Sequence, residues 1–385
     1  MLAIVLSGGG AKGAYEAGVW KTLRKLKIKY DIVTGTSIGA LNGMMMTQNE
    51  FYKCLRLWKN ISFEQLYDDF EYKKDDTLQI YKNYLDKIID GGIDTHKIEN
   101  LINNYYKSNK IYNSKISFGV VSYNVTDKKP VYSTNKNTRP NRLKQYILAS
   151  ATCYPAFKPT KIGTDTYIDG GFYDNLPLNL AIELGADEII AVDLKAIGFK
   201  KSIKSKDIPV TYITPKTKLD SFLMFESHST RKMINLGYND TMKVFGKYDG
   251  DAYTFKKGTI RHLYRKYSNK MVKISNEYED LSKKIKKESM LNIIEDTLEI
   301  FGIAVDKVYT SISYNELLKN KIDEIEDINL NEFNVEELKK VFDKKAIVKY
   351  LYTKIKNHGK INNIILNLFQ KEYLAAVYLV AIRSW

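Results

Sequence analysis

The chain begins with a short apolar run, Ala3–Leu6, that leads directly into a glycine-rich turn. A run of this length, followed by helical periodicity over Ala14–Leu26, predicts a buried parallel strand, a tight turn and a covering helix. Further strand and helix signals alternate along the chain as far as Glu188–Asp193. Alternation of this kind predicts an α/β fold, with a mainly parallel central sheet covered by helices.

The alternation fades well before the end of the 385 residues. We therefore expect one domain over residues 1–215 and a mainly helical C-terminal portion over residues 216–385, with helical patterns over Glu277–Phe301 and Val335–Tyr352. The longest apolar run, Tyr373–Ile382, falls short of the roughly 18 residues of a membrane span. We expect it to be a core helix rather than a lipid-docking segment, because an exposed run of this kind invites aggregation.

The net charge of +15 favours anionic partners. Nucleic acid and an anionic membrane surface both fit the charge, but no nucleic-acid motif is present, so no nucleic-acid partner is expected. Two stretches concentrate the basic residues, Lys195–Lys218 and Lys256–Lys273. They are either solvated surface or contacts to anionic lipid head groups.

The remaining composition points to a reducing compartment. The chain has two cysteines, Cys54 and Cys153, too few for a disulfide framework. Its first residues lack the charged and apolar regions of an export signal. We expect a cytoplasmic protein, peripheral to the membrane, with no cofactor and no metal site.

The segment Gly35-Thr36-Ser37-Ile38-Gly39 is a G-x-S-x-G motif between a short strand and a helix. This is the context of a nucleophile elbow, in which a serine is held out at the carboxyl edge of a sheet. A tight turn with a helix-capping serine would give the same pattern.

The turn after the first strand contains Gly8, Gly9, Gly10, Ala11, Lys12 and Gly13. Its backbone N–H groups can form an anion nest. Gly8, Gly10 and Gly13 also satisfy G-x-G-x-x-G, the dinucleotide fingerprint, but the second strand does not end in the acidic residue that a ribose requires. The alternative is an oxyanion hole that serves Ser37.

A serine nucleophile needs a base. No histidine among His96, His228, His262 and His358 follows a predicted strand end. Asp169-Gly170-Gly171 does follow one, and the two glycines allow close approach to another loop. An Asp-Gly-Gly segment by itself is usually only a turn. We interpret Asp169 as the base because this segment occurs together with the glycine-rich turn and the G-x-S-x-G motif.

Taken together, these motifs resemble those of the patatin-like phospholipases. The resemblance rests on Gly8–Gly13, Gly35–Gly39 and Asp169–Gly171 in this order, on Ala149–Phe157, and on the stretches 174–177 and 185–192. It covers roughly residues 1–215 and implies a three-layer patatin-like sandwich for the catalytic domain.

The resemblance also implies a Ser-Asp dyad. Ser37 would attack an ester carbonyl, and Asp169 would accept and return the proton. Backbone N–H groups of Gly9, Gly10 and Ala11 in the glycine loop would hold the oxyanion. Lys12 would support that loop or meet a lipid phosphate. The implied activity is a phospholipase A or lysophospholipase acting on membrane phospholipid.

Other functions remain open at this stage. An esterase or thioesterase on soluble acyl compounds would use the same dyad, and a dinucleotide-binding protein would use Gly8–Gly13. Some patatin-like enzymes are switched on by a nucleotide or a host protein, so an unknown activator, or a second copy of the chain, is an open partner.

Overall fold

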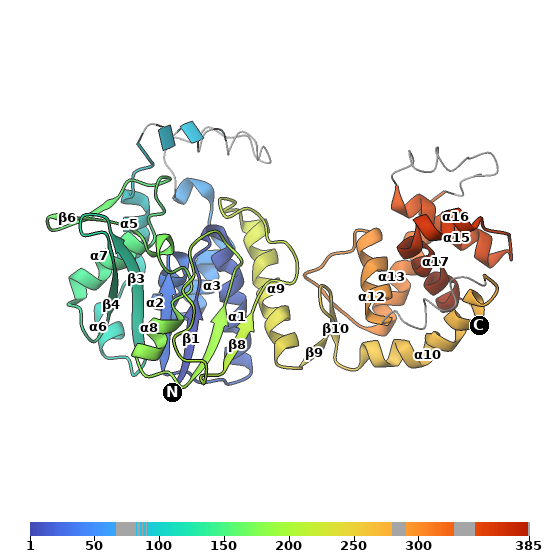
Figure 1. Cartoon of the computed structure of the whole chain (residues 1–385), viewed down its shortest axis with the longest axis horizontal. Coiled ribbons are helices and arrows are strands. Elements are labelled where there is room, and N and C mark those ends of the chain that lie inside the picture. The colour runs from blue at the N-terminus through green and yellow to red at the C-terminus, as the bar shows by residue number, and fades with distance from the viewer. Residues whose placement is uncertain are drawn as a thin grey trace. The chain divides into compact units, whose positions relative to one another are not determined.

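The computed structural model describes residues 1–66, 82, 85–86, 88–89, 91–278, 290–326 and 343–383. The chain divides into two compact units, Met1–Val244 and Phe245–Trp385 (Figure 1). The predicted boundary at 215/216 falls inside the first unit, because α9 (Ser227–Val244) packs along α1 (Gly13–Lys25). A buried hydrogen bond of 2.9 Å from the Tyr15 hydroxyl to the Asp240 carboxylate joins the two helices.

The first unit is built around an eight-stranded sheet with the order β5-β6-β3-β2-β1-β7-β8, and β4 pairs with β3. Neighbouring strands run parallel from β3 through β2, β1 and β7 to β8, whereas β4 and β6 are antiparallel to β3, and β5 is antiparallel to β6. The strands are β1 (Leu2–Leu6), β2 (Ile32–Thr36), β3 (Ser117–Asn124), β4 (Lys129–Thr134), β5 (Thr160–Ile162), β6 (Asp165–Asp169), β7 (Glu188–Val192) and β8 (Val210–Ile213).

Helices cover both faces of this sheet. In β1, Ala3 and Val5 belong to a cluster that includes apolar residues of α8 (Leu178–Glu183), while Ile4 and Leu6 are buried on the opposite face. Burial on both faces explains why the strand is a continuous apolar run. The predicted α/β class with a mainly parallel sheet is confirmed.

The other helical segments of the first unit are η1 (Gly10–Lys12), α2 (Ile38–Thr47), α3 (Phe51–Asn60), η2 (Phe63–Gln65), α5 (His96–Tyr105), α6 (Ser108–Tyr112), α7 (Pro140–Ser150) and η3 (Gly170–Phe172). Of these, α2 contacts β1, β2 and β3, and α7 contacts β3 and β6.

The second unit is mainly helical, as expected. Its helices are α10 (Thr259–Ser275), α12 (Met290–Ile300), α13 (Ser311–Asp323), α15 (Lys344–Lys356), α16 (Asn363–Leu368) and α17 (Gln370–Arg383). The helices predicted over Glu277–Phe301 and Val335–Tyr352 correspond to α12 and α15. Part of each predicted range lies outside the described residues. Three short strands, β9 (Tyr248–Asp249), β10 (Thr254–Lys256) and β11 (Val308–Tyr309), form a small sheet that the sequence patterns did not predict.

The apolar run Tyr373–Ile382 lies in α17, at the centre of the hydrophobic core of the second unit. Tyr373, Val377, Tyr378 and Leu379 have no exposed surface. The prediction of a core helix is confirmed. Within the described ranges, no helix is both long and apolar enough to cross a bilayer.

Candidate active site

Ser37 stands between β2 and α2 in a conformation that few residues adopt. Its φ of 56° and ψ of −127° place it in a strained region of the backbone map. The flanking glycines permit the turn: a Cβ on Gly35 would lie 2.3 Å from the carbonyl oxygen of Gly39, and a Cβ on Gly39 would lie 2.6 Å from that of Leu6. The G-x-S-x-G spacing is therefore a steric requirement of this strand–turn–helix.

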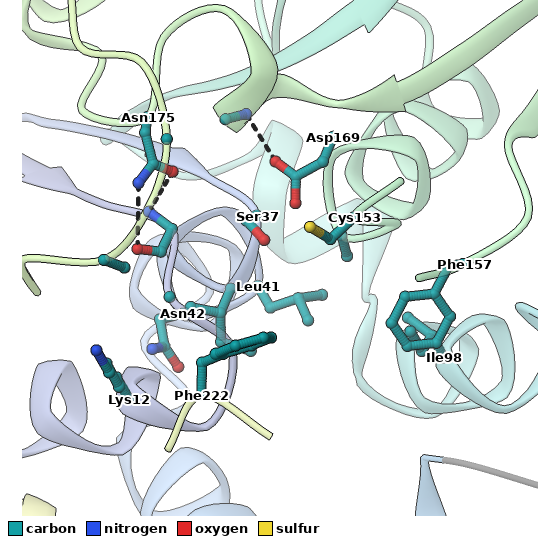
Figure 2. A pocket seen from close by; sticks show the side chains of 18 of the residues that line it. Lys12, Ser37, Leu41, Asn42, Ile98, Cys153, Phe157, Asp169, Asn175 and Phe222 are labelled. Carbon is teal, nitrogen blue, oxygen red and sulfur yellow. Dashed lines mark hydrogen bonds between the residues drawn. The ribbon is translucent and has the colours of Figure 1, made fainter. Parts of the chain in front are cut away.

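Strand register brings Asp169 to the same row of the sheet. Thr36 pairs with Val121 of β3, and Asp169 pairs with Ser122, the next residue of that strand. Because β4 occupies the other edge of β3 at these residues, β2 and β6 lie along one edge of β3, and Ser37, the residue after Thr36, lies next to the end of β6 at Asp169. Figure 2 shows the Ser37 hydroxyl and the Asp169 carboxyl pointing toward one another.

The Asp169 carboxyl is buried, and burial raises its pKa from an ordinary 3.8 to about 7. Hydrogen bonds from the Ser37 hydroxyl and from the Gly171 N–H, the latter 2.7 Å long, favour the ionised form and partly offset the burial. A carboxylate with a pKa near neutrality can accept a proton from a neighbouring hydroxyl and later release it.

The glycine loop keeps two N–H groups for a ligand. The N–H of Gly8 donates to Asn175, that of Ala11 to Phe222, that of Lys12 to Gly9 and that of Gly13 to Gly10. Among the described residues, no acceptor takes the N–H of Gly9 or of Gly10. Of the donors that the resemblance implies, Ala11 is engaged with Phe222, whereas the N–H groups of Gly9 and Gly10 are available to a ligand.

Asn175 holds this loop in place. Its side chain accepts from the Gly8 N–H at 3.1 Å and donates to the Gly8 carbonyl oxygen at 3.4 Å (Figure 2). It also donates to the Ile197 carbonyl oxygen at 3.4 Å. The hydroxyl of Ser150 accepts from the Ser37 N–H at 2.9 Å. Both residues belong to stretches on which the sequence resemblance rests, but their contacts depend on segments more than a hundred residues away.

A second buried network fixes the helix that follows Ser37. Asn42 of α2 donates to the Glu16 carboxyl at 2.8 Å and to the Gly13 carbonyl at 2.9 Å, and accepts from the Trp58 indole at 2.9 Å. Burial raises the pKa of Glu16 well above its usual value. The network joins α1, α2 and α3 behind the elbow. Gly13 belongs to the predicted glycine loop, whereas Glu16, Asn42 and Trp58 were not predicted.

Ser37 and Asp169 open into a cavity of about 450 Å³. This volume lies within the usual range of small-molecule pockets. Gly9 and Gly10 line it beside Ser37. Apolar side chains of α2, α3 and α5 also line it: Leu41, Met44, Met45, Leu57, Trp58, Ile98, Leu101 and Ile102.

Other ionisable groups differ from Asp169 in their position or in their pKa. None of His96, His228, His262 and His358, all within the described ranges, lines the cavity. Cys153 does, but desolvation at the cavity wall and the nearby Asp169 raise the pKa of its thiol to about 12, although part of the residue is exposed to solvent. Cys54 and Cys153 are both free thiols. In the part of the chain that the structure describes, no cluster of three or more His, Cys, Asp or Glu side chains could hold a metal ion.

Lys12 also lines the cavity. Partial burial, and then the nearby charge of Lys218, lower the pKa of its ammonium group. A cation in this position can meet an anionic group of a ligand at the mouth of the cavity.

Part of the first unit is similar in sequence to known proteins. Residues 4–182 match the sequence model of the patatin-like phospholipase family. Patatin-like phospholipase domain-containing protein 7 of Rattus norvegicus is 26% identical over 195 residues, which are 50% of this chain and 13% of that protein. Lysophospholipase nte1 of Aspergillus terreus is 27% identical over 205 residues, 50% of this chain and 12% of that protein.

Among solved structures, VipD from Legionella pneumophila aligns over 99% of this chain and 90% of its own, with a TM-score of 0.41 and 14% identity. The sequence matches span about half of this chain and about an eighth of those curated relatives. Both the family match and the motifs fall in the first unit. The chain therefore carries a patatin-like phospholipase domain over residues 4–182.

Proposed function

We propose that this protein is a serine lipid acyl hydrolase of phospholipase A or lysophospholipase type, which cleaves carboxylic esters of membrane lipids. One observation carries the proposal: a serine on a strained elbow faces a buried aspartate of raised pKa inside an apolar cavity. The names of similar proteins, such as lysophospholipase nte1, also support a phospholipid substrate.

The proposed reaction runs through Ser37 and Asp169. The Ser37 hydroxyl attacks the ester carbonyl while the Asp169 carboxylate takes its proton, and the N–H groups of Gly9 and Gly10 stabilise the oxyanion. Asp169 then gives the proton to the departing alcohol, which leaves an acyl group on Ser37. A water molecule, deprotonated by Asp169, attacks this acyl ester and releases the fatty acid, and the returned proton restores the Ser37 hydroxyl.

The apolar cavity favours a long acyl chain over a small polar acyl group. An esterase or thioesterase on soluble compounds would use the same chemistry and stays the first alternative. A dinucleotide-binding protein is the second, because Gly8, Gly10 and Gly13 fit its fingerprint. Against it, β2 ends at Thr36 and is followed by Ser37, and neither residue offers a carboxylate to a ribose.

Lipid mass spectrometry tests the proposal. Phospholipid vesicles incubated with wild-type protein should release free fatty acid and lysophospholipid, and Ser37→Ala protein should release neither. The matched control is His96→Ala, which should act like wild type because His96 pairs with Asp94 on the surface, away from the cavity. Turnover of soluble esters or thioesters without any turnover of lipid would favour the first alternative. Micromolar binding of NAD, lost in Gly10→Ala, would favour the second.

A further inference from the structure

Large apolar side chains lie on the outer rim of the cavity, where their exposure to water is unfavourable. Four of the fifteen strongly exposed large apolar side chains in the described chain line this one cavity: Tyr154, Phe172, Ile197 and Phe199. Ile197 is 96% exposed and Phe199 is 66% exposed. An exposed apolar group around a pocket mouth is typical of a surface that meets another apolar phase.

The backbone imposes this exposure. The Phe199 N–H donates to the Gly171 carbonyl at 3.0 Å, and the Phe199 carbonyl accepts from the Asn175 N–H at 2.5 Å. The Asn175 side chain holds the Ile197 carbonyl as well. Ile197 and Phe199 are thus anchored to the segment that carries Asp169, and their side chains stay at the mouth of the cavity.

Positive charge surrounds these apolar residues. Lys195, Lys200 and Lys201 flank them along the chain. Among the described residues, Lys195 and Lys200 both pair with one carboxylate, the buried Asp193, at 3.2 and 2.7 Å. Lys201 lies 3.7 Å from the centre of the Tyr173 ring. The stretch from residue 195 to 218 has seven lysines and one acid. This face of the first unit therefore combines apolar side chains with an excess of cations.

We propose that this rim, defined as Tyr154, Phe172, Ile197 and Phe199 with the adjoining lysines, docks on an anionic lipid bilayer. Ile197 and Phe199 enter the boundary between head groups and acyl chains, and the lysines meet the anionic head groups. The inference deepens the proposed function and rests on it. Docking in this way would let a lipid acyl chain pass from the bilayer into the cavity without crossing water.

The experiment uses full-length protein with Ser37→Ala, so that binding is measured without hydrolysis. Ile197→Trp provides a reporter on the rim. Tyr52→Trp is the matched control: Tyr52 is 76% exposed and lies at the start of α3, beyond the end of α2, which runs about 15 Å away from Ser37. The native tryptophans, Trp20, Trp58 and Trp385, are common to both variants, so the response of the Ser37→Ala parent is measured under the same conditions and subtracted.

Vesicles of phosphatidylcholine, with or without phosphatidylglycerol, are added at low and high salt. The fluorescence of the tryptophan at position 197 should shift to shorter wavelength with anionic vesicles, and brominated lipid should quench it. The tryptophan at position 52 should do neither. Equal responses at the two positions, no response at position 197, or a response that ignores both lipid charge and salt would overturn the proposal.

A second pair of variants measures affinity. Ile197→Ser combined with Phe199→Ser should weaken vesicle binding on the order of 100-fold, because two large apolar side chains no longer leave water. Tyr52→Ser should bind as the parent does. Unchanged binding of the double variant would refute the docking rim. Because no step here requires hydrolysis, a protein that docks on lipid without cleaving it would contradict the proposed function and leave the docking intact.

Discussion

The pH dependence of hydrolysis follows from the burial of Asp169. With its pKa raised to about 7, this carboxyl is largely protonated at pH 6 and largely ionised at pH 8. Only the ionised form can accept the proton of Ser37. We therefore expect kcat/KM to rise with pH, to reach about one tenth of its plateau at pH 6, and to level off above pH 8.

The Asp169 carboxyl also makes the unfolding free energy depend on pH. A carboxyl whose pKa rises from 3.8 to about 7 on folding holds its proton about 4 kcal/mol more tightly in the folded protein than in the unfolded chain. The folded state therefore loses relative stability as pH rises from about 4 to about 7. Asp169→Asn removes this loss, so its unfolding free energy relative to wild type should increase by up to about 4 kcal/mol over that window.

Two assays check these expectations. Hydrolysis of a soluble p-nitrophenyl ester gives kcat/KM from pH 5 to pH 9, where Asp169→Asn should be slower by a factor on the order of 10³. Urea unfolding of both proteins gives the difference between their unfolding free energies at each pH. Burial also raises the pKa of Asp174 to about 6, but the contribution of Asp174 is the same in both proteins and cancels in this difference. A flat rate from pH 5 to pH 8, or a stability difference that ignores pH, would refute the role assigned to Asp169.

Three further changes probe the loop and the second unit. Gly10→Ala should lower kcat by roughly 10²–10³. Gly10 has a φ of 57°, and an added Cβ would lie 2.4 Å from the Phe222 carbonyl oxygen, so the substitution should displace an N–H donor. The ester assay measures kcat, and circular dichroism checks that the variant is folded. Leu379→Ala, at a site without exposed surface, should lower the unfolding free energy by about 2–5 kcal/mol in urea titrations. Deleting residues 373–385 should leave insoluble protein in a sedimentation assay, whereas a soluble and folded product would contradict the core position of α17.

The strand–turn–helix around Ser37 is predictable from local patterns, because its steric requirements lie within five residues. Strand, glycine, serine and glycine follow one another, and the steric limits at Gly35 and Gly39 do not depend on distant parts of the chain. Asp169 was predicted at a strand end, yet the antiparallel direction of β6 and its register with β3 set its distance from Ser37. That register is a property of the assembled sheet.

Features that depend on distant contacts were not predictable in the same way. Asn175 and Phe222 decide which N–H groups of the glycine loop stay available, and both lie more than 160 residues from that loop. The first unit extends to Val244 because α9 packs on α1, although the strand–helix alternation fades earlier. The walls of the cavity come from α2, α3 and α5, whose apolar faces resemble those of any core helix.

The most direct test of the proposed chemistry is covalent labelling of Ser37. A fluorophosphonate probe should modify the wild-type protein at this residue, as identified by mass spectrometry of the peptide that contains it. Labelling should disappear in Ser37→Ala, slow strongly in Asp169→Asn, and persist when His96, His228, His262 or His358 is changed singly to Ala. Equal labelling of wild type and Ser37→Ala, or loss of labelling in a single histidine variant, would contradict a Ser37–Asp169 dyad.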